Sequence, residues 1–437
     1  MKVRIGDVCK YRKEFFQIDD EKEYTQITVK LHRKGIVLRK RIIGKDIRTK
    51  RQRLCKANDF IVAEMDAKFG GYGIIPEELD GSIVSSHYYL YEIDKTKLLP
   101  DFFKFIIQAN LIQEQIKAVG STNYSRVSYK EVLEYEIPCP DINIQRKIVQ
   151  SLSRVKNTHF ELDNEIQTQQ TLLKKLRQSI LQEAIEGKLT ADWRAAHPDV
   201  EPASALLEKI RAEKEQLVKE KKIRKQKPLP PIEEGEVPFE IPENWEWCRL
   251  LSIADGFQYG TSSKSRKEGL VPVLRMGNIQ DGKVVLDDLV FSSDKEEIKK
   301  YLLNKNDLLF NRTNSRELVG KTAIYNHSNK AIYAGYLVRF YLFGNIDANY
   351  INYLMNSDFH RQWCDEFKTD AIGQSNINAT KLKGYRVPLP PLEEQKEIVK
   401  KIEKLFTLCD TLEAQIDQSK TNSEALMQVV LREAFEE

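Results

Sequence analysis

The sequence predicts an α+β protein with two α/β domains separated by two long helices that pack as a coiled coil, and with a pseudo-twofold internal repeat. Residues 141–190 contain no Gly or Pro before Gly187, and their apolar residues recur mostly three, four or seven positions apart. A second run of this kind covers residues 391–435. The segments that introduce the two runs match at an offset of 250 residues, since Pro388 corresponds to Pro138 (388 − 138 = 250). A repeat of half a chain is a signal of the whole fold.

The first run has the spacing of a coiled-coil seam or a long amphipathic helix, and not that of a strand. Pro140 before it and Gly187 near its end are the residues expected at the two ends of a helix. Such a helix is roughly 65 Å long and has no globular core, so its apolar stripe needs a partner. The predicted stripe consists of Ile144, Ile148, Leu152, Val155, Leu162, Ile166, Leu173, Leu176, Ile180 and Ala184.

The partner of this helix is predicted to lie in the same chain. At the offset of 250, Tyr385 corresponds to Tyr135, and Ile398 corresponds to Ile148. The second helix therefore repeats the first and offers a matching stripe. That stripe consists of Leu405, Leu408, Leu412, Ile416, Leu426 and Val430.

The repeat and the Pro-rich stretch at 228–242 divide the chain into five parts. These are a first α/β domain (1–136), a central long helix (137–190), a short helix with a Pro-rich linker (191–242), a second α/β domain (243–386) and a C-terminal long helix (387–437). Within the domains we expect a strand or turn at 4–8, a flexible loop at 70–73, strands in 83–93 and helices at 100–119 and from 348. The short helix is expected at 203–227, and residues 306–310 repeat residues 58–62.

The composition is that of a folded chain, with 41% hydrophobic and 31% charged residues. No apolar run approaches the 18 residues of a membrane helix, so no membrane contact is expected. The six cysteines lie tens of residues apart without a CxxC pair, which argues against structural zinc and disulfides and fits the cytoplasm. The net charge is only +4, so a nucleic-acid surface would have to be local.

The motifs of catalysis and cofactor binding are missing. Residues 315–322 resemble a phosphate-binding P-loop, but Ser315 replaces the first Gly, and Gly320 to Thr322 are expected to end a loop and enter a strand. The Gly-rich stretch 70–73 is not accompanied by the Asn-Pro-Pro-aromatic signature of amino-methyltransferases. The six histidines form no pair with the spacing of metal ligands. We therefore predict no catalytic residue, metal or cofactor in this chain.

A basic stretch is the main candidate for contact with DNA. Between Lys30 and Lys56 there are twelve Lys or Arg residues against one acid, Asp46, and the interleaved apolar residues predict short strands with a basic face. A solvated surface is the alternative. The predicted phosphate contacts are Arg33, Lys34, Arg39, Lys40, Arg41, Lys45, Arg48, Lys50 and Arg51. A second basic run, 209–227, is either a further contact or a connector.

Polar loops provide the other candidates, because Arg pairs with guanine and Asn with adenine in the major groove. The alternative is that these residues cap helices and form turns. The candidates are Ser121, Thr122, Asn123 and Arg126 in the first domain, and Arg275, Asn278, Arg312, Asn314, Arg316, Ser375, Asn376 and Asn378 in the second.

The order of these parts resembles the specificity subunit of type I restriction–modification enzymes (HsdS) over the whole chain. The resemblance is carried by Ile137-Pro138, Val387-Pro388-Leu389-Pro390-Pro391-Leu392-Glu393-Glu394-Gln395-Lys396, residues 179–190, Ala191-Asp192-Trp193-Arg194 and residues 207–213. One departure is that the first half has Asp141-Ile142-Asn143-Ile144-Gln145 where the second has Pro-Leu-Glu-Glu-Gln.

The resemblance implies two target-recognition domains that each read half of a split, asymmetric site in double-stranded DNA. It implies that the two helices pack as an antiparallel coiled coil, which acts as a spacer and docks two methyltransferase (M) subunits. These subunits carry SAM and methylate adenine. Separate motor–nuclease (R) subunits would use ATP and Mg²⁺, so this chain would hold no cofactor. An interaction scaffold without DNA specificity is the alternative, and a fused methyltransferase is disfavoured by the missing motifs.

Overall fold

The structure, a computed structural model, describes residues 2–116 and 126–435. By its internal contacts the chain divides into unit 1, formed by residues 1–168 and 416–437, and unit 2, formed by residues 169–415. Each of the two long helices thus contributes residues to both units.

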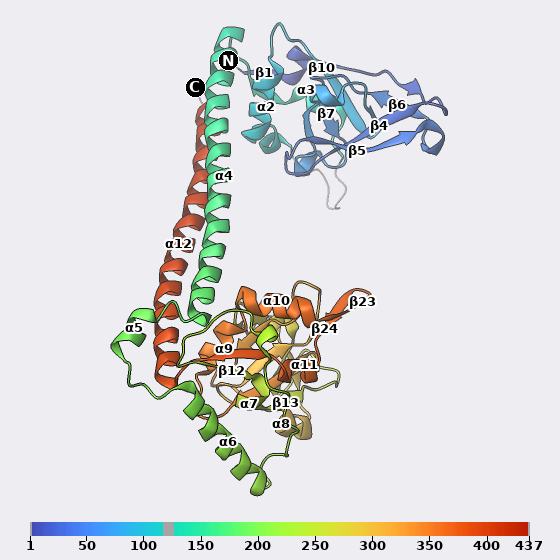
Figure 1. Cartoon of the computed structure of the whole chain (residues 1–437). Helices are drawn as coiled ribbons and strands as arrows, with labels where there is room; N and C mark the ends of the chain where they lie inside the picture. The colour runs from blue at the N-terminus through green and yellow to red at the C-terminus, as the bar shows by residue number, and fades with distance from the viewer. Residues whose placement is uncertain (1, 117–125, 436–437) are drawn as a thin grey trace. The chain divides into compact units, whose positions relative to one another are not determined.

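Unit 1 contains a four-stranded antiparallel sheet with the order β2-β10-β7-β8 and a five-stranded sheet with the order β3-β6-β9-β4-β5 (Figure 1). Its core surrounds the central strand β7, where Phe60 contacts the rings of Tyr91 and Phe103. The strands are β1 (Lys2–Arg4), β2 (Cys9–Tyr11), β3 (Phe16–Gln17), β4 (Glu23–Val29), β5 (Ile36–Ile43), β6 (Arg51–Leu54), β7 (Phe60–Ala63), β8 (Tyr72–Ile74), β9 (Ile83–Val84), β10 (Tyr88–Ile93) and β11 (Glu136–Pro138). The helices are α1 (Ile5–Val8), α2 (Pro100–Gln108) and α3 (Tyr129–Glu134).

Unit 2 is built around a six-stranded sheet with the order β13-β22-β18-β20-β16-β15, together with the sheets β17-β14-β21, β19-β24-β23 and β12-β25. Its strands are β12 (Glu246–Arg249), β13 (Ala254–Tyr259), β14 (Val271–Leu274), β15 (Ile279–Gln280), β16 (Lys283–Val284), β17 (Val290–Ser292), β18 (Leu308–Asn311), β19 (Thr313–Asn314), β20 (Thr322–Ile324), β21 (Ile332–Tyr333), β22 (Leu337–Leu342), β23 (Thr369–Ala371), β24 (Gln374–Asn376) and β25 (Arg386–Leu389). Its helices are α5 (Ala191–Ala196), α6 (Ala203–Lys219), α7 (Leu250–Ile253), α8 (Lys295–Tyr301), α9 (Ala348–Leu354), α10 (Asp358–Phe367) and α11 (Ala379–Lys383).

The two units share one backbone framework. Asp59 and Asp307 precede the central strands β7 and β18, and each follows an asparagine with φ of 71°. The carbonyl of Asp59 accepts from the Ile75 amide at 2.9 Å, and that of Asp307 accepts from the Tyr325 amide at 2.8 Å. The predicted internal repeat is therefore confirmed down to single hydrogen bonds, which explains why 58–62 and 306–310 resemble each other.

The long helices α4 (Ile142–Ile185) and α12 (Leu392–Glu433) begin 392 − 142 = 250 residues apart, although the residues at their starts differ. The shared glutamine is the reason. Gln145 is fully buried, and its Oε1 accepts from the Leu99 amide at 2.9 Å, just before α2. Gln395 is also fully buried and accepts from the Asp347 amide at 3.0 Å, just before α9. Each glutamine fixes the start of a long helix against a helix of its own unit.

The two long helices run antiparallel, as predicted. In unit 1, Leu152 near the start of α4 packs with Leu431 near the end of α12. In unit 2, Arg177 of α4 forms ion pairs with Asp410 at 2.6 Å and Glu413 at 3.1 Å, both in the earlier part of α12. An early residue of one helix thus meets a late residue of the other in both units.

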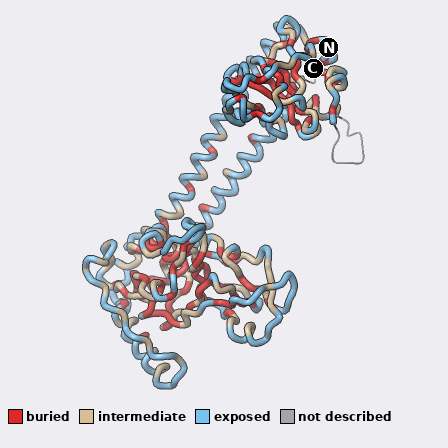
Figure 2. Tube along the Cα trace, turned by 90° about the vertical axis from the view of Figure 1, so that its right-hand side faces the viewer, coloured by how far each residue is buried: buried red, intermediate tan, exposed pale blue. Residues whose placement is uncertain are grey.

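The buried seam of this pair is narrower than the predicted stripe. On α4 it follows Leu152, Ile166, Leu173 and Ile180, which are separated by multiples of seven. Figure 2 shows mostly exposed residues along both helices. The prediction is wrong for Ile144, Val155, Leu162, Leu176, Leu408, Leu412 and Leu426, which are exposed. A two-helix contact buries few positions per heptad, and a wider stripe needs a third surface.

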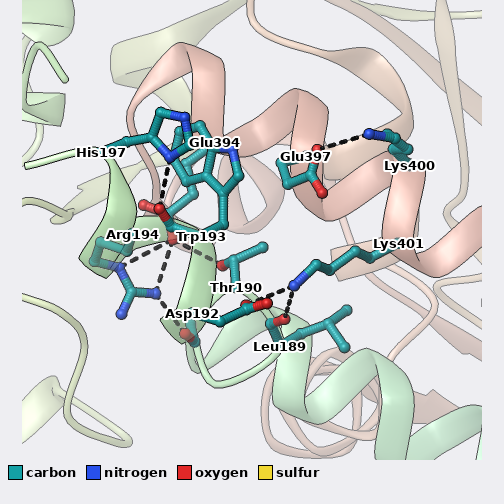
Figure 3. A network of polar contacts seen from close by, with 11 residues as sticks. Leu189, Thr190, Asp192, Trp193, Arg194, His197, Glu394, Glu397, Lys400 and Lys401 are labelled. Atoms are coloured by element: carbon teal, nitrogen blue, oxygen red, sulfur yellow. Dashed lines mark hydrogen bonds and ion pairs between the residues drawn. The ribbon is translucent and has the colours of Figure 1, made fainter.

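In unit 2 a polar network joins the end of α4 to the start of α12 (Figure 3). The fully buried carboxylate of Glu394 accepts from Thr190 Oγ1 at 2.8 Å, Arg194 Nε at 3.0 Å and Trp245 Nε1 at 2.9 Å. Lys401 donates to the Leu189 carbonyl at 3.0 Å. The segment 190–194, which carries part of the family resemblance, therefore anchors these two helix ends.

Residues 4–8, predicted as a strand or turn, contain the end of β1 and the single helical turn α1. Three local predictions differ from the structure. The helix predicted for 100–119 ends at Gln108, because Asn110 adopts a left-handed φ of 71°. The helix predicted for 203–227 ends at Lys219, before Lys221 with φ of 58°. The Gly-rich stretch is not a flexible loop, since Tyr72 begins the buried strand β8. Among the described residues, no helix has both the length and the apolar content needed to cross a membrane.

Candidate nucleic-acid interface

One end of the six-stranded sheet of unit 2 gathers several polar segments. Strands β13 and β18 finish at this end, and the antiparallel strands β22 and β20 begin there. The amide of Arg312 donates to the Tyr336 carbonyl at 2.9 Å, and that of Gly335 donates to the Thr261 carbonyl at 2.7 Å. We call this surface, formed by residues 259–267, 312–316, 336 and 369–376, the polar edge of unit 2.

The hairpin β23–β24 extends the polar edge (Figure 1). Strand β24 pairs with β19, so Asn376 lies opposite Thr313 and Ser375 lies opposite Asn314. The structure thereby brings together two loops that lie about 60 residues apart in the sequence and that both carry predicted contacts. The turn of the hairpin holds Ile372, which is completely exposed.

Arg312 is held in a defined position at this edge. Its guanidinium lies 4.6 Å from the centroid of the Tyr259 ring, and its Nη2 donates to Asn376 Oδ1 at 3.4 Å. The Asn376 amide in turn donates to Thr313 Oγ1 at 2.7 Å. Among the described residues no carboxylate lies within 4.0 Å of this guanidinium, and its buried Nε has no partner. A partly buried charge without a counter-ion is unfavourable, so a negative or accepting ligand fits here.

The other predicted residues of the polar edge are partly engaged within the protein. Asn314 Oδ1 accepts from the Ser315 amide at 2.8 Å, whereas Arg316 is exposed. Ser375 is buried and donates to Asp370. Next to the edge, Asn378 caps α11 by accepting from the Lys381 amide at 2.9 Å, so the helix-cap interpretation applies to it.

Arg275 and Asn278 are not joined to the polar edge. Arg275 forms an ion pair with Asp288 at 2.9 Å. Asn278 is buried, and its amide donates to the carbonyls of Val285 at 3.0 Å and Asp287 at 2.8 Å. These contacts hold the loop that follows β16, and in this conformation Asn278 presents no free group to a base.

In unit 1 the basic stretch contains the strands β5 and β6. Strand β5 forms a hairpin with the preceding β4 and is the edge strand of its sheet. The predicted strands are therefore confirmed. Leu38 pairs with Ile27 and Lys40 with Gln26, which leaves Arg39 as the extra residue of a β-bulge. Contact with phosphate stays a prediction for the residues that are exposed: Lys34, Arg39, Lys40, Arg41, Lys45, Arg48 and Arg51.

Three of the predicted basic residues have partners inside unit 1. Lys50 pairs with Asp20 and donates to the Gly44 carbonyl at 2.7 Å. Arg33 donates to Asn110 Oδ1. Arg51, although exposed, places its guanidinium 4.4 Å from the centroid of the Phe15 ring. These contacts stabilise the hairpin and its neighbours, and they leave fewer of the predicted basic side chains free to contact phosphate.

The end of the four-stranded sheet in unit 1 corresponds to the polar edge of unit 2. Glu64 follows β7 as Arg312 follows β18, at an offset of 312 − 64 = 248. The Val127 amide donates to the Glu64 carbonyl at 3.1 Å, and the Ile377 amide donates to the Arg312 carbonyl at 2.9 Å. Glu64 and Arg312 therefore occupy the same position in the two units.

The Glu64 carboxylate has two basic neighbours in unit 1. His87 Nδ1 lies 3.2 Å from it, and Arg126 Nη1 lies 3.7 Å from it. Burial, followed by the nearby Glu64 carboxylate, raises the pKa of Tyr89 above its ordinary value. Of the predicted polar loop, only Arg126 can be placed, since Ser121, Thr122 and Asn123 lie outside the described residues.

Sequence reasoning missed Glu64, Tyr259 and the loop 260–267. The signal for Glu64 was present, because the offset of 248 that joins 58–62 to 306–310 continues to 64 and 312. The loop 260–267 carries the exposed residues Lys264, Arg266 and Lys267 among serines. No three His, Cys, Asp or Glu side chains gather as metal ligands in the described part of the chain.

The sequence model of one protein family, described as "Type I restriction modification DNA specificity domain", matches residues 1–171 and 242–419. The EcoEI specificity subunit of Escherichia coli is 32% identical over 262 residues, which cover 58% of this chain and 43% of that protein. The EcoAI specificity subunit of Escherichia coli is 36% identical over 253 residues, 56% of this chain and 42% of that protein. The matched part is thus less than half the length of either relative.

Two solved structures share the fold. One comes from a study of complex assembly and conformational transition of the type I R-M system; it has a TM-score of 0.68 and 18% identity, covering 100% of this chain and 97% of that chain. The HsdS subunit from Thermoanaerobacter tengcongensis has a TM-score of 0.54 and 18% identity, covering 100% and 96%. At this identity the likeness concerns the fold.

Proposed function

We propose that this chain, which belongs to the family of type I restriction–modification DNA specificity domains, is the DNA-recognition subunit of a type I restriction–modification complex. It would read a bipartite, asymmetric site in double-stranded DNA, one half through unit 1 and the other through unit 2. The observation that carries the proposal is the repeat itself. The family domain matches twice, and the two units share their hydrogen-bonded framework, yet the equivalent positions Glu64 and Arg312 differ in charge.

The chain would act without catalysis of its own, inside a complex whose other subunits carry the chemistry. We propose two methyltransferase subunits that bind SAM and motor–nuclease subunits that use ATP and Mg²⁺, in the cytoplasm. Exposed apolar side chains along the two long helices support docking, since a surface of this kind favours a protein partner. They are Val155, Phe160, Leu162, Leu172 and Leu176 on α4, and Leu408, Leu412, Leu426 and Val429 on α12.

An interaction scaffold without DNA specificity is less well supported. A scaffold needs neither the exposed basic strand β5 nor the uncompensated Arg312. It would also bind DNA weakly or not at all at physiological salt, whereas a phosphate-contacting surface gives an affinity that depends steeply on salt.

The proposal is tested by mapping adenine methylation in the genome of a host that expresses this chain together with the proposed methyltransferase subunits. The matched control expresses the methyltransferase subunits alone. The expected result is methylated adenine in one asymmetric motif of two separated half-sites, present only with this chain. A methylation pattern that is the same with and without the chain would overturn the proposal.

A further inference from the structure

The residue that follows the central strand of each unit is Glu64 in unit 1 and Arg312 in unit 2. We propose that this position determines specificity in both half-sites, with opposite hydrogen-bonding character. Arg312 would read a guanine in the half-site of unit 2, and Glu64 would read the exocyclic amino group of a cytosine in the half-site of unit 1. The inference rests on the proposed function and adds to it which residue reads which kind of base edge.

The equivalence of the two positions is a property of the backbone. The carbonyl of Glu64 accepts from Val127 and that of Arg312 accepts from Ile377, two amides that are themselves 250 residues apart. The strands β2 and β13 also match, since each lies two places from the central strand of its sheet, and they finish at Tyr11 and Tyr259, with 259 − 11 = 248. Two side chains that start from the same place in the same framework meet equivalent parts of a ligand.

The guanidinium of Arg312 is held in a position to donate hydrogen bonds to a ligand. The Tyr259 ring and Asn376 fix its guanidinium plane, and among the described residues its Nη1 has no hydrogen-bond partner and its charge has no counter-ion. Arginine presents its donors in a planar fork that matches the O6 and N7 acceptors of guanine. A fixed guanidinium whose Nη1 has no acceptor among the described residues can donate that group to guanine.

Glu64 has the opposite character, because an ionised carboxylate only accepts hydrogen bonds. Its side chain keeps 16% of its surface exposed, and His87 and Arg126 lie beside it. A carboxylate can accept from the amino group of cytosine, but it repels the acceptors of guanine. The same position in the two units therefore selects different base edges.

The test uses the full chain in complex with its methyltransferase subunits. The variants are Arg312→Gln, Arg312→Lys and Glu64→Gln. Methylation rates are measured on duplexes that carry each base in turn at every position of both half-sites. The matched controls are Lys305→Gln and Glu77→Gln, which make the same charge changes on exposed residues at the opposite ends of the two sheets.

Arg312→Gln is expected to lower discrimination for guanine at one position of one half-site by about 5- to 150-fold, which corresponds to the loss of a good pair of hydrogen bonds. Arg312→Lys keeps the charge and loses the fork, so it should relax the same position. Glu64→Gln should relax one position of the other half-site. The two controls should leave both half-sites unchanged.

Several outcomes would overturn the inference. A uniform fall of methylation on all duplexes, with an unchanged motif, would make Arg312 a phosphate contact. Relaxation of both half-sites by one substitution, or of neither, would contradict a single reading position in each unit. If Arg312→Gln does not fold, Arg312→Lys decides between these results. Absence of any bipartite motif with the unaltered chain would instead overturn the proposed function.

Discussion

The carboxylate of Glu394 receives hydrogen bonds from three residues of unit 2, Thr190, Arg194 and Trp245. Glu394→Ala should lower the free energy of unfolding of unit 2 by about 3–5 kcal/mol, because it leaves the partly buried guanidinium of Arg194 without its counter-ion and the buried indole N–H of Trp245 without an acceptor. All four tryptophans lie in unit 2, at 193, 245, 247 and 363, so denaturant unfolding followed by tryptophan fluorescence reports on this unit.

The control for this prediction is Glu397→Gln, also on α12. Glu397 makes an ion pair at 3.4 Å with Lys400, whose side chain is 78% exposed, so its removal should cost little. Similar small shifts for both variants would show that the Glu394 network is not what anchors the helix ends.

His360 makes the stability of unit 2 depend on pH. Burial lowers the pKa of His360 from 6.5 to about 4, and its Nε2 lies 2.9 Å from the Gly320 carbonyl, to which it donates in the neutral form. As the pH falls below about 6.5, the unfolded chain takes up a proton at this residue and the folded chain does not until about pH 4. Folding stability from this residue is therefore fully present above pH 6.5 and is lost as the pH falls toward 4.

The expected loss is about 2–3 kcal/mol between pH 7.5 and pH 4.5. Unfolding followed by tryptophan fluorescence at the two pH values should show a smaller loss for His360→Gln than for the unaltered chain. His327→Gln is the control, because His327 is only partly buried. An equal loss for His360→Gln and the unaltered chain would mean that His360 does not titrate in this way.

At the scale of elements, the edge strand β5 carries the clearest prediction about DNA. Replacing Arg39, Lys40 and Arg41 by Gln should weaken binding to any duplex and flatten the dependence of log K on log salt by about 0.9 for each phosphate that the variant no longer neutralises. The half-site sequences should not change. Binding is measured at several salt concentrations against a control with the exposed Lys396, Lys400 and Lys404 of α12 replaced by Gln.

An unchanged salt slope in the β5 variant would contradict phosphate contact. It would favour a different role for these charges, since exposed lysine and arginine on an edge strand also prevent pairing with other chains.

The long elements were predictable from the sequence because their signals are repeated many times. The heptad spacing and the offset of 250 identified α4, α12 and their pairing, and the family resemblance implied that the pair is antiparallel. The ends of shorter helices were not predictable, because single left-handed residues such as Asn110 decide them. The glycines on both sides of Tyr72 predict a loop, and nothing in this pattern indicates that Tyr72 is buried in the core.

The candidate interface was predictable in part. Composition alone pointed to the basic strand and to Arg312. Composition could not show that Asn278 is buried, because this depends on how the loop after β16 turns back onto it. Nor could it show that Lys50 pairs with Asp20, which is distant in the sequence. Nor could it show that the loops of Arg312 and Asn376 share one sheet, which is a matter of strand pairing.

At the scale of the whole molecule, we infer that one framework occurs twice and carries two independent reading surfaces. The structure shows where to divide the chain to test this. Strand β1 pairs with β11, which ends at Pro138, and α4 begins at Ile142. An exchange of residues 1–140 for those of a relative with a different target therefore keeps this strand pair within the donated segment.

The most direct test is a methylation map of the chimeric chain, expressed with the methyltransferase subunits that serve the unaltered chain. We predict that one half-site takes the sequence read by the relative while the other half-site, read by unit 2, remains unchanged. A map in which both half-sites change together, or in which neither changes, would contradict the claim that the two units read DNA independently.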